Sequence, residues 1–280
     1  MGHFSGSLVQ RETRTFALLD QFVSVLAPGS NNVFFWPFLE GNGDIVQPYG
    51  TGIDEELDVT AAGSTLALDA ADTGFHPVRH VGGIHSYHFE DGDSQALVGA
   101  DAATLSFNGS TDTAFTVGCF FYTHAAAGTL LAKYDVLGSA EEWRLHVLAG
   151  PDLALEVFET TKDDSETAQT TTALNLGQWY FGAVAYGGAG GDGAGGKTAA
   201  ADMTIYIDGA AVSAATSEVG GTYADMIGGA APLMIGATDD KAAPANEFNG
   251  RIALPFLVNA ELTAANLVTL NGIGTTLIGL

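Results

Sequence analysis

The sequence has little cysteine and little positive charge. Its 280 residues include a single cysteine, Cys119, so no disulfide can form within the chain and a cysteine-rich zinc site is excluded. Lysines and arginines number 9 against 33 aspartates and glutamates, which gives a formal net charge of -24. Because phosphates are bound by clustered Lys and Arg, this balance argues against nucleic acid and anionic membrane surfaces as partners.

Long hydrophobic runs are also missing. No stretch approaches the ~18 consecutive apolar residues of a transmembrane helix. The opening MGHFSGSLVQRETRTF lacks the basic segment and apolar run of a secretory leader. We therefore expect a protein that is made in a cytoplasm, or that leaves it by another route. With 46% hydrophobic residues, the chain is too apolar to be disordered.

Residues 1–30 differ from the rest of the chain in their periodicity. Apolar residues recur at helical spacing, which predicts an amphipathic helix over residues 8–26, ended by Ala27-Pro28-Gly29. The apolar stripe consists of Phe16, Leu19, Phe22, Val23 and Leu26. Because an isolated helix of this length is marginally stable, the stripe needs a surface to cover it.

From residue 31 onward the pattern changes to short strands. The clearest runs are 33–38, 114–122, 143–148, 153–158, 179–186, 203–207, 233–236 and 250–258. They predict an all-β domain over 31–270, a two-sheet antiparallel jelly-roll sandwich with an N-terminal helical or extended arm. A short helix is expected near 262–267, and residues 271–280 are assigned to a tail. The aromatic residues expected to be buried are Trp36, Phe89, Phe115, Phe121, Tyr206 and Phe256.

The order of several motifs resembles one family. The motifs are Leu130-Leu131-Ala132-Lys133, Leu176-Gly177-Gln178-Trp179-Tyr180, Ile205-Tyr206-Ile207-Asp208-Gly209 and Asn249-Gly250-Arg251-Ile252. Together they resemble the strands of the laminin-G-like branch of the concanavalin A-like jelly rolls, over roughly residues 33–270. The resemblance implies a sandwich used mostly for binding, and it leaves the ligand open.

A glycine-rich segment matches a phosphate-binding pattern. Residues 191–198 read GDGAGGKT, which satisfies G-x-x-x-x-G-K-T. That chemistry needs a helix after the loop, whereas the next run, 203–207, has the character of a strand, and Asp192 would repel phosphate. We expect residues 187–199 to be a surface connection between two antiparallel strands.

Two further groups of residues are candidate metal ligands. His76, His80, His85 and His88 crowd together, yet they meet no zinc-ligand spacing, so partly exposed histidines are the favoured interpretation. Three acidic runs begin at Asp54, Asp163 and Asp239. Oxygen-rich loops suit calcium, and the resemblance implies that calcium is possible, but solvated loops are the default interpretation. The metal ligands are therefore unknown.

Catalytic patterns are not found. No strand carries the E-x-D-x-x-E of the retaining glucanases, since Glu141 and Glu142 are adjacent, and no G-x-S-x-G elbow occurs. Cys119, in the middle of a predicted strand, is expected to be buried and inert. We therefore expect a protein that is not an enzyme.

The expected function is a structural or binding module. The first hypothesis is a phage virion surface protein, a capsid decoration or tail adhesion component that is made in the host cytoplasm. Its stripe, Phe16, Leu19, Phe22, Val23 and Leu26, would dock on a partner protein, on a sister subunit of a homo-oligomer, or on the flank of its own domain. We expect a partner protein, and we expect the sandwich to fold without residues 1–30. The alternative is an extracellular, calcium-dependent, glycan-binding lectin-like module, and a glycoside hydrolase comes third.

Overall fold

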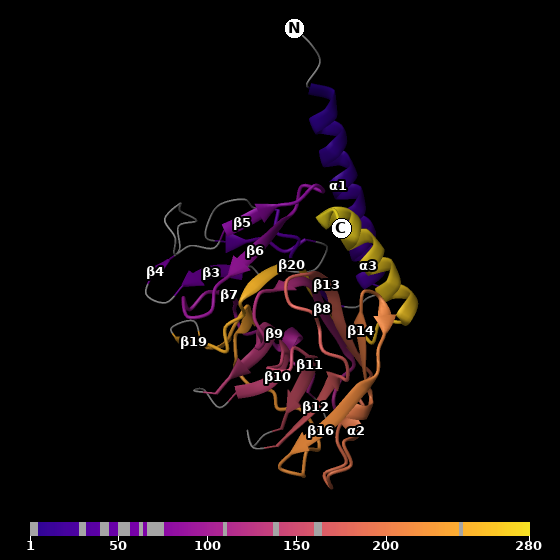
Figure 1. Cartoon of the computed structure of the whole chain (residues 1–280). Helices are drawn as coiled ribbons and strands as arrows, with labels where there is room; N and C mark the ends of the chain where they lie inside the picture. Colours follow the sequence, from indigo (N-terminus) through magenta and orange to yellow (C-terminus); the bar gives the residue numbers. More distant parts are fainter. Residues whose placement is uncertain are drawn as a thin grey trace.

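The computed structural model describes residues 5–27, 32–39, 45–49, 57–61, 64–65, 76–108, 111–136, 140–159, 164–240 and 243–280. Within these ranges the chain forms two large antiparallel sheets, with two long helices against the outer face of one of them (Figure 1). The helices are α1 (Ser5–Leu26), α2 (Thr198–Ala201) and α3 (Ala264–Ile278), and a 3-10 turn spans Ala103–Leu105. This architecture confirms the predicted sandwich with an N-terminal helix.

Sheet A has eight strands in the order β15-β14-β13-β8-β20-β6-β5, and β1 also pairs with β20. The strands are β1 (Val33–Phe35), β5 (His76–Arg79), β6 (His85–Phe89), β8 (Phe115–Thr123), β13 (Trp179–Tyr186), β14 (Met203–Ile207), β15 (Ala210–Ala211) and β20 (Gly250–Val258). The longest of them, β8 and β20, are neighbours at the centre of the sheet.

Sheet B has ten strands in the order β16-β12-β11-β10-β9-β17-β7-β3-β2, and β4 also pairs with β3. The strands are β2 (Ile45–Val46), β3 (Leu57–Ala61), β4 (Ser64–Thr65), β7 (Ala96–Gly99), β9 (Gly128–Asp135), β10 (Ala140–Val147), β11 (Leu153–Phe158), β12 (Ser165–Thr170), β16 (Ala214–Val219) and β17 (Leu233–Ile235). A separate hairpin, β18 (Thr238–Asp240) with β19 (Ala243–Ala245), lies beside β9.

The main core lies between the two sheets. Four of the aromatic residues expected to be buried belong to it and are fully buried: Trp36, Phe89, Phe115 and Phe121. Trp143 joins them, and its indole N–H donates to the Leu105 carbonyl oxygen at 3.2 Å. The alternation of the strands therefore predicts this core well.

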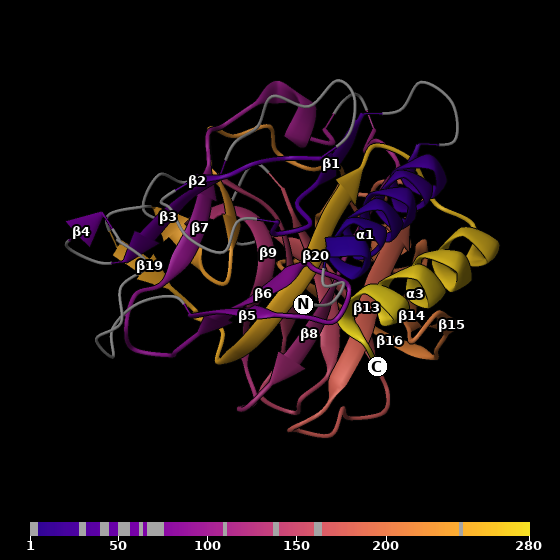
Figure 2. The same ribbon diagram turned by 90° about the horizontal axis from the view of Figure 1, so that it is seen from above.

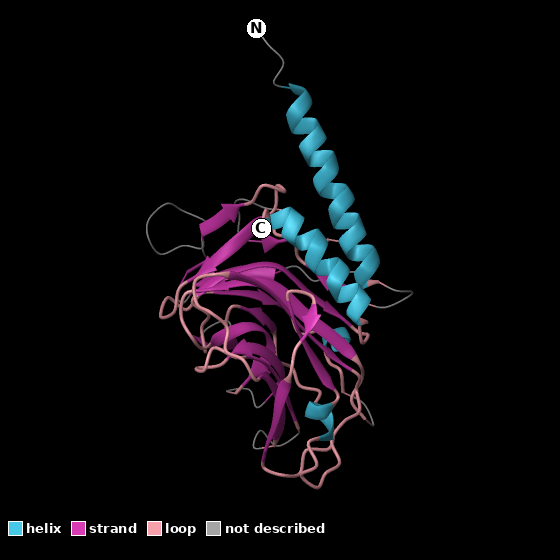
Figure 3. Cartoon of the chain, turned by 45° about the vertical axis from the view of Figure 1, so that its right-hand side comes forward, coloured by secondary structure: helices cyan, strands magenta, loops and turns pink. Residues whose placement is uncertain are grey.

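A second apolar cluster lies on the outer face of sheet A, under α1 and α3. Figures 2 and 3 show the two helices side by side against this sheet. Tyr206 and Phe256 are buried as expected, but in this outer cluster and not between the sheets. The central strands are thus covered on both faces: in β8, Phe121 faces the inner core and Phe120 the outer cluster. The sandwich therefore buries apolar side chains on the outer face of sheet A as well as between its two sheets.

The chain's own domain covers much of the apolar stripe on α1. Leu19, Phe22 and Leu26 are 0% exposed within the outer cluster, whereas Phe16 is 48% exposed and Val23 is partly buried. The first half of the α1 backbone extends beyond the body of the domain (Figures 1 and 3). The flank of the domain is therefore the surface for three of the five stripe residues. Docking of this segment on a partner stays a prediction.

The last helix is longer than the sequence predicts. Thr263 caps α3, and its side chain accepts a hydrogen bond from the Asn266 amide. Residues 271–280, which the sequence assigns to a tail, mostly continue this helix, and Leu277 is fully buried. Gly274 permits close packing, because a Cβ there would lie 2.1 Å from the Phe120 ring. Among the described helices, α1 and α3 included, none has the length and hydropathy of a membrane-spanning segment.

Candidate functional site

A cavity of about 460 Å³ opens on the outer face of sheet B, at the start of β9 and the end of β10. Four segments distant in sequence build its walls: the turn after β6, the start of β9, the end of β10 with the following turn, and β19 with the residues after it. The polar residues that line it are Asp91, Thr129, Arg144, His146, Asn246 and Glu247. We call this space the β9–β10 cavity.

The strand period places the polar side chains on this outer face. In β10, Trp143, Leu145 and Val147 belong to the inner core, so Arg144 and His146 point the other way. His146 is the register partner of Thr129 in β9. The sequence predicts this strand but not the cavity beside it, because alternation alone does not show which outward-facing residues meet across strands.

Arg144 is held rigidly on the outer face. Its guanidinium contacts the Glu156 carboxylate at 2.7 and 2.8 Å, and the Ser165 hydroxyl donates to the same carboxylate at 2.9 Å. The guanidinium carbon also lies 4.9 Å from the centre of the Tyr134 ring and 5.6 Å from that of Phe158. The ion pair and the flanking rings fix the position of Arg144 and neutralise its charge.

Thr129 and His146 present polar atoms that no group of the described protein satisfies. Both side chains are at least nine-tenths buried, and Thr129 Oγ1 and His146 Nε2 have no hydrogen-bond partner. Burial, and secondly the charge of Arg144, lowers the pKa of His146 to about 3, so the imidazole is neutral at physiological pH. Unpaired buried polar atoms are rare and costly in folded proteins, so this pair beside the cavity marks the place to look for a ligand.

The opposite wall of the cavity depends on one glycine. Gly128 has a φ of 140°, and a Cβ there would lie 2.7 Å from both the Glu247 carbonyl oxygen and the Phe248 Cα. The close approach lets the Thr129 amide donate to the Asn246 carbonyl at 2.9 Å. The Glu247 carboxylate accepts from the Gly92 amide at 2.5 Å, which connects this wall to the turn after β6.

The cation and the imidazole of the β9–β10 cavity have different contacts. Its cation is paired with Glu156, and its neutral imidazole has no carboxylate within hydrogen-bond distance, since His146 Nε2 and Glu156 Oε2 lie 3.8 Å apart. A second cavity, of about 480 Å³, is lined by Thr170, Thr171, Leu174 and Tyr180 among others. The Tyr180 hydroxyl there already accepts from the Asn175 amide at 2.8 Å. The β9–β10 cavity is therefore the stronger candidate for ligand binding.

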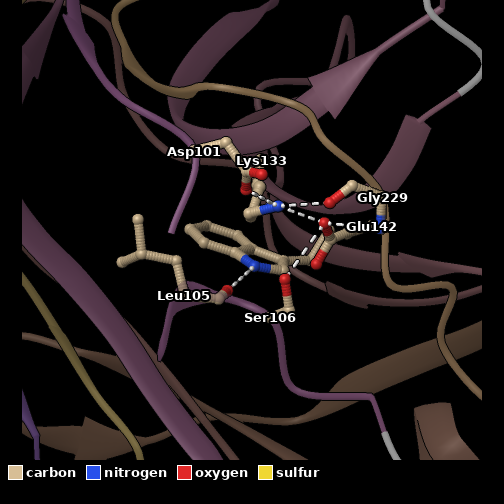
Figure 4. A network of polar contacts seen from close by, with 7 residues as sticks. Asp101, Leu105, Ser106, Lys133, Glu142 and Gly229 are labelled. Atoms are coloured by element: carbon tan, nitrogen blue, oxygen red, sulfur yellow. Dashed lines mark hydrogen bonds and ion pairs between the residues drawn. The ribbon is translucent and has the colours of Figure 1, made fainter. Parts of the chain in front are cut away.

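A buried ion network supports the same two strands (Figure 4). Lys133 of β9 and Glu142 of β10 are 0% exposed and paired with each other, and Asp101 lies 2.9 Å from the Lys133 Nζ. Glu142 also accepts from the Gly229 amide at 2.9 Å. Lys133 lies in one of the motifs that carry the family resemblance, but its partner nine residues later was not recognised. The network fixes β9 and β10 against two connecting segments.

The glycine-rich loop lies where the sequence predicts it, and its backbone amides are hydrogen-bonded to the loop's own Asp192 side chain. Residues 187–202 join β13 and β14, which are antiparallel neighbours. The short helix α2 (Thr198–Ala201), which the sequence does not predict, follows the glycines within this connection. The Asp192 carboxylate accepts from the amides of Ala194 at 2.8 Å and Gly196 at 3.0 Å, and these hydrogen bonds lower its pKa. Amides that would hold a phosphate are therefore already bound to a carboxylate.

The other candidate residues have structural contacts. His80 lies 2.9 Å from the Ser86 hydroxyl, and His85 Nδ1 lies 3.1 Å from the Phe38 carbonyl oxygen. Cys119 is fully buried, and burial raises the pKa of its thiol. The side chain of His76, and residues 54–56 and 163 of the acidic runs, lie outside the described residues. Within the described ranges, no three His, Cys, Asp or Glu side chains converge as metal ligands.

A family model agrees with this architecture. The model described as the concanavalin A-like lectin/glucanases superfamily matches residues 95–267. The chain belongs to this superfamily. None of the curated protein sequences matches the chain.

Three solved structures have folds similar to that of this chain. Domain 4 of AbnA, a GH43 extracellular arabinanase from Geobacillus stearothermophilus solved with arabinotriose, has a TM-score of 0.55 at 12% identity, over 87% of this chain and 100% of that domain. The binding domain of botulinum neurotoxin DC in complex with SialylT has a TM-score of 0.55 at 11% identity, over 89% and 52% of the two chains. A Trypanosoma rangeli sialidase mutant displaying trans-sialidase activity has a TM-score of 0.52 at 13% identity, over 98% and 40%. At these identities the likeness shows the fold alone, and the match spans about half or less of the last two chains.

Proposed function

We propose that the chain is a non-catalytic carbohydrate-binding module that holds a glycan in the β9–β10 cavity. The observation that carries the proposal is the pair of buried, unpartnered polar atoms, Thr129 Oγ1 and His146 Nε2, beside a cavity of about 460 Å³. Cavities of this size, with few converging polar groups, are typical of small-molecule sites.

The ligands bound to two of the similar structures give general support to the proposed ligand class. The arabinanase domain was solved with arabinotriose, and the neurotoxin binding domain with SialylT. Membership of a lectin and glucanase superfamily is compatible with the same ligand class. Because the same fold hosts several functions, the fold alone does not identify the ligand, and the cavity carries the proposal.

Glycan-array binding followed by calorimetry tests the proposal. Ala149 is exposed at the rim of the β9–β10 cavity, so Ala149→Trp blocks the entrance without changing the core. We expect this variant to lose the glycans that the parent protein binds. Thr172→Trp, at the exposed rim of the second cavity, is the matched control and keeps them. Absence of any glycan binding, or equal effects of the two variants, contradicts the proposal. Repeating the assay with a chelator tests the predicted calcium dependence.

A virion surface role remains our second proposal, and one feature favours it. The first half of α1 extends beyond the body of the domain, where it is accessible to a partner particle or a second copy (Figure 3). Deleting residues 1–14 keeps Leu19, Phe22 and Leu26 in place. We expect the truncated protein to stay folded and to stop co-sedimenting with particles or with itself. Unchanged assembly would exclude docking through this segment.

A further inference from the structure

We infer that the β9–β10 cavity selects neutral, hydroxyl-rich sugars and rejects acidic ones. The inference rests on the proposed function, because it specifies the class of glycan that this cavity takes.

The charges around the cavity disfavour an anionic ligand. Arg144 is the one cation that lines it among the described residues, and its guanidinium is paired with Glu156 at 2.7 Å. Asp91 and Glu247 also line the cavity and add two acidic groups. With a formal charge of -24 on the whole chain, the cavity and its surroundings repel a carboxylate or sulfate.

The unpartnered atoms match hydroxyl groups instead. The Thr129 hydroxyl can both donate and accept, and a neutral imidazole nitrogen does one or the other according to its tautomer. Because His146 is buried and uncharged at physiological pH, it gives no ionic attraction to an acid. Both atoms are buried in the free protein, so a sugar hydroxyl, which donates and accepts, would satisfy Thr129 Oγ1 and His146 Nε2 once these side chains turn toward the cavity.

The ion pair between Arg144 and Glu156 also favours a neutral ligand. Releasing Arg144 to bind an acid would leave the Glu156 carboxylate, which is 9% exposed, without its cation. Breaking a partly buried pair in this way is costly, since it leaves an uncompensated charge. An acidic sugar that displaced Glu156 from Arg144 would therefore disrupt the outer face of sheet B.

The test uses pairs of glycans that share one core and differ only by an acidic group. Binding of the full chain is measured by calorimetry to neutral glycans and to their sialylated, uronic or sulfated counterparts. We expect neutral members to bind at least ten-fold more tightly, with the difference narrowing at high salt because screening weakens the repulsion.

Substitutions then connect the preference to the named atoms. Thr129→Val and His146→Phe keep the shape of each side chain but remove its polar atom, and we expect each to weaken neutral binding by about ten-fold. Thr171→Val, at the second cavity, is the control and leaves binding unchanged. Glu247→Gln removes an acidic group from the cavity wall without changing a core residue, and we expect it to raise the affinity for acidic glycans. This variant tests the inference even if Thr129→Val and His146→Phe fail to fold.

The outcomes separate this inference from the proposed function. A preference for acidic glycans that Ala149→Trp abolishes overturns the inference and leaves the proposed function intact. No binding of any glycan overturns both. Neutral binding that is insensitive to Thr129→Val and His146→Phe overturns the inference, because the polar atoms would then not contact the sugar.

Discussion

Replacing Phe22 by alanine tests whether α1 is part of the folded domain. Phe22 is 0% exposed, its ring stacks on Phe35 with 4.6 Å between centroids, and its edge meets Phe256 at 6.0 Å. Phe35 lies in β1 and Phe256 in β20, so the ring joins α1 to two strands of sheet A.

The size of the effect follows from these contacts. Removing a fully buried phenylalanine costs about 3–5 kcal/mol, and the upper part of this range applies where the surroundings cannot collapse. The outer face of a central β-strand is such a surrounding, since its backbone is hydrogen-bonded on both sides. We therefore expect Phe22→Ala to lower the free energy of unfolding by about 4 kcal/mol.

Urea unfolding followed by circular dichroism and tryptophan fluorescence measures the change. Phe16→Ala is the matched control, because Phe16 lies on the same helix and is 48% exposed, so its effect stays within about 0.5 kcal/mol. If Phe22→Ala leaves stability unchanged but abolishes self-association, α1 docks on a partner and the packing described for it is wrong. By the same reasoning, we expect deletion of residues 1–30 to destabilise the domain, contrary to the expectation from sequence.

Three further predictions concern buried polar groups. Burial, then the charge of Glu218, raises the pKa of Glu166. A raised folded-state pKa gives stability at low pH that is lost as the pH rises, so Glu166→Gln should gain more over the parent at pH 8 than at pH 5 in thermal melts, and an equal gain at both would contradict this. Lys133→Met leaves the buried Glu142 without its cation and should cost about 3–5 kcal/mol in urea unfolding, whereas a loss below about 1 kcal/mol would show that Glu142 does not need it. Cys119 should react with a thiol reagent only after denaturation, and rapid reaction in the native protein would refute its burial.

The strands of the sandwich could be predicted from sequence because their pattern is local. The predicted runs at 153–158 and 179–186 coincide with β11 and β13, where branched and aromatic residues are bounded by turns. The last helix could not be predicted beyond 262–267, since Gly272, Gly274 and three threonines oppose it. Packing on sheet A stabilises α3, and packing between distant segments is not visible in a local pattern.

The candidate site also combines a local pattern, which the sequence shows, with contacts between segments, which it does not. Arg144 and His146 could be placed on one face of a strand from alternation alone. That Thr129 and Asn246 join them depends on strand pairing between β9 and β10 and on the approach of the residues after β19 to Gly128. These are contacts between residues far apart in sequence, so the cavity could not be predicted from sequence.

The outer cluster also has a consequence for the order of events during synthesis. It joins Leu19, Phe22 and Leu26 to Phe256 and to α3, which leave the ribosome more than two hundred residues later. Until then, the apolar stripe of α1 lacks most of its final partners, and long-range contacts of this kind form slowly. Folding intermediates of the nascent chain should therefore expose α1, which makes this helix the segment that a chaperone would bind first.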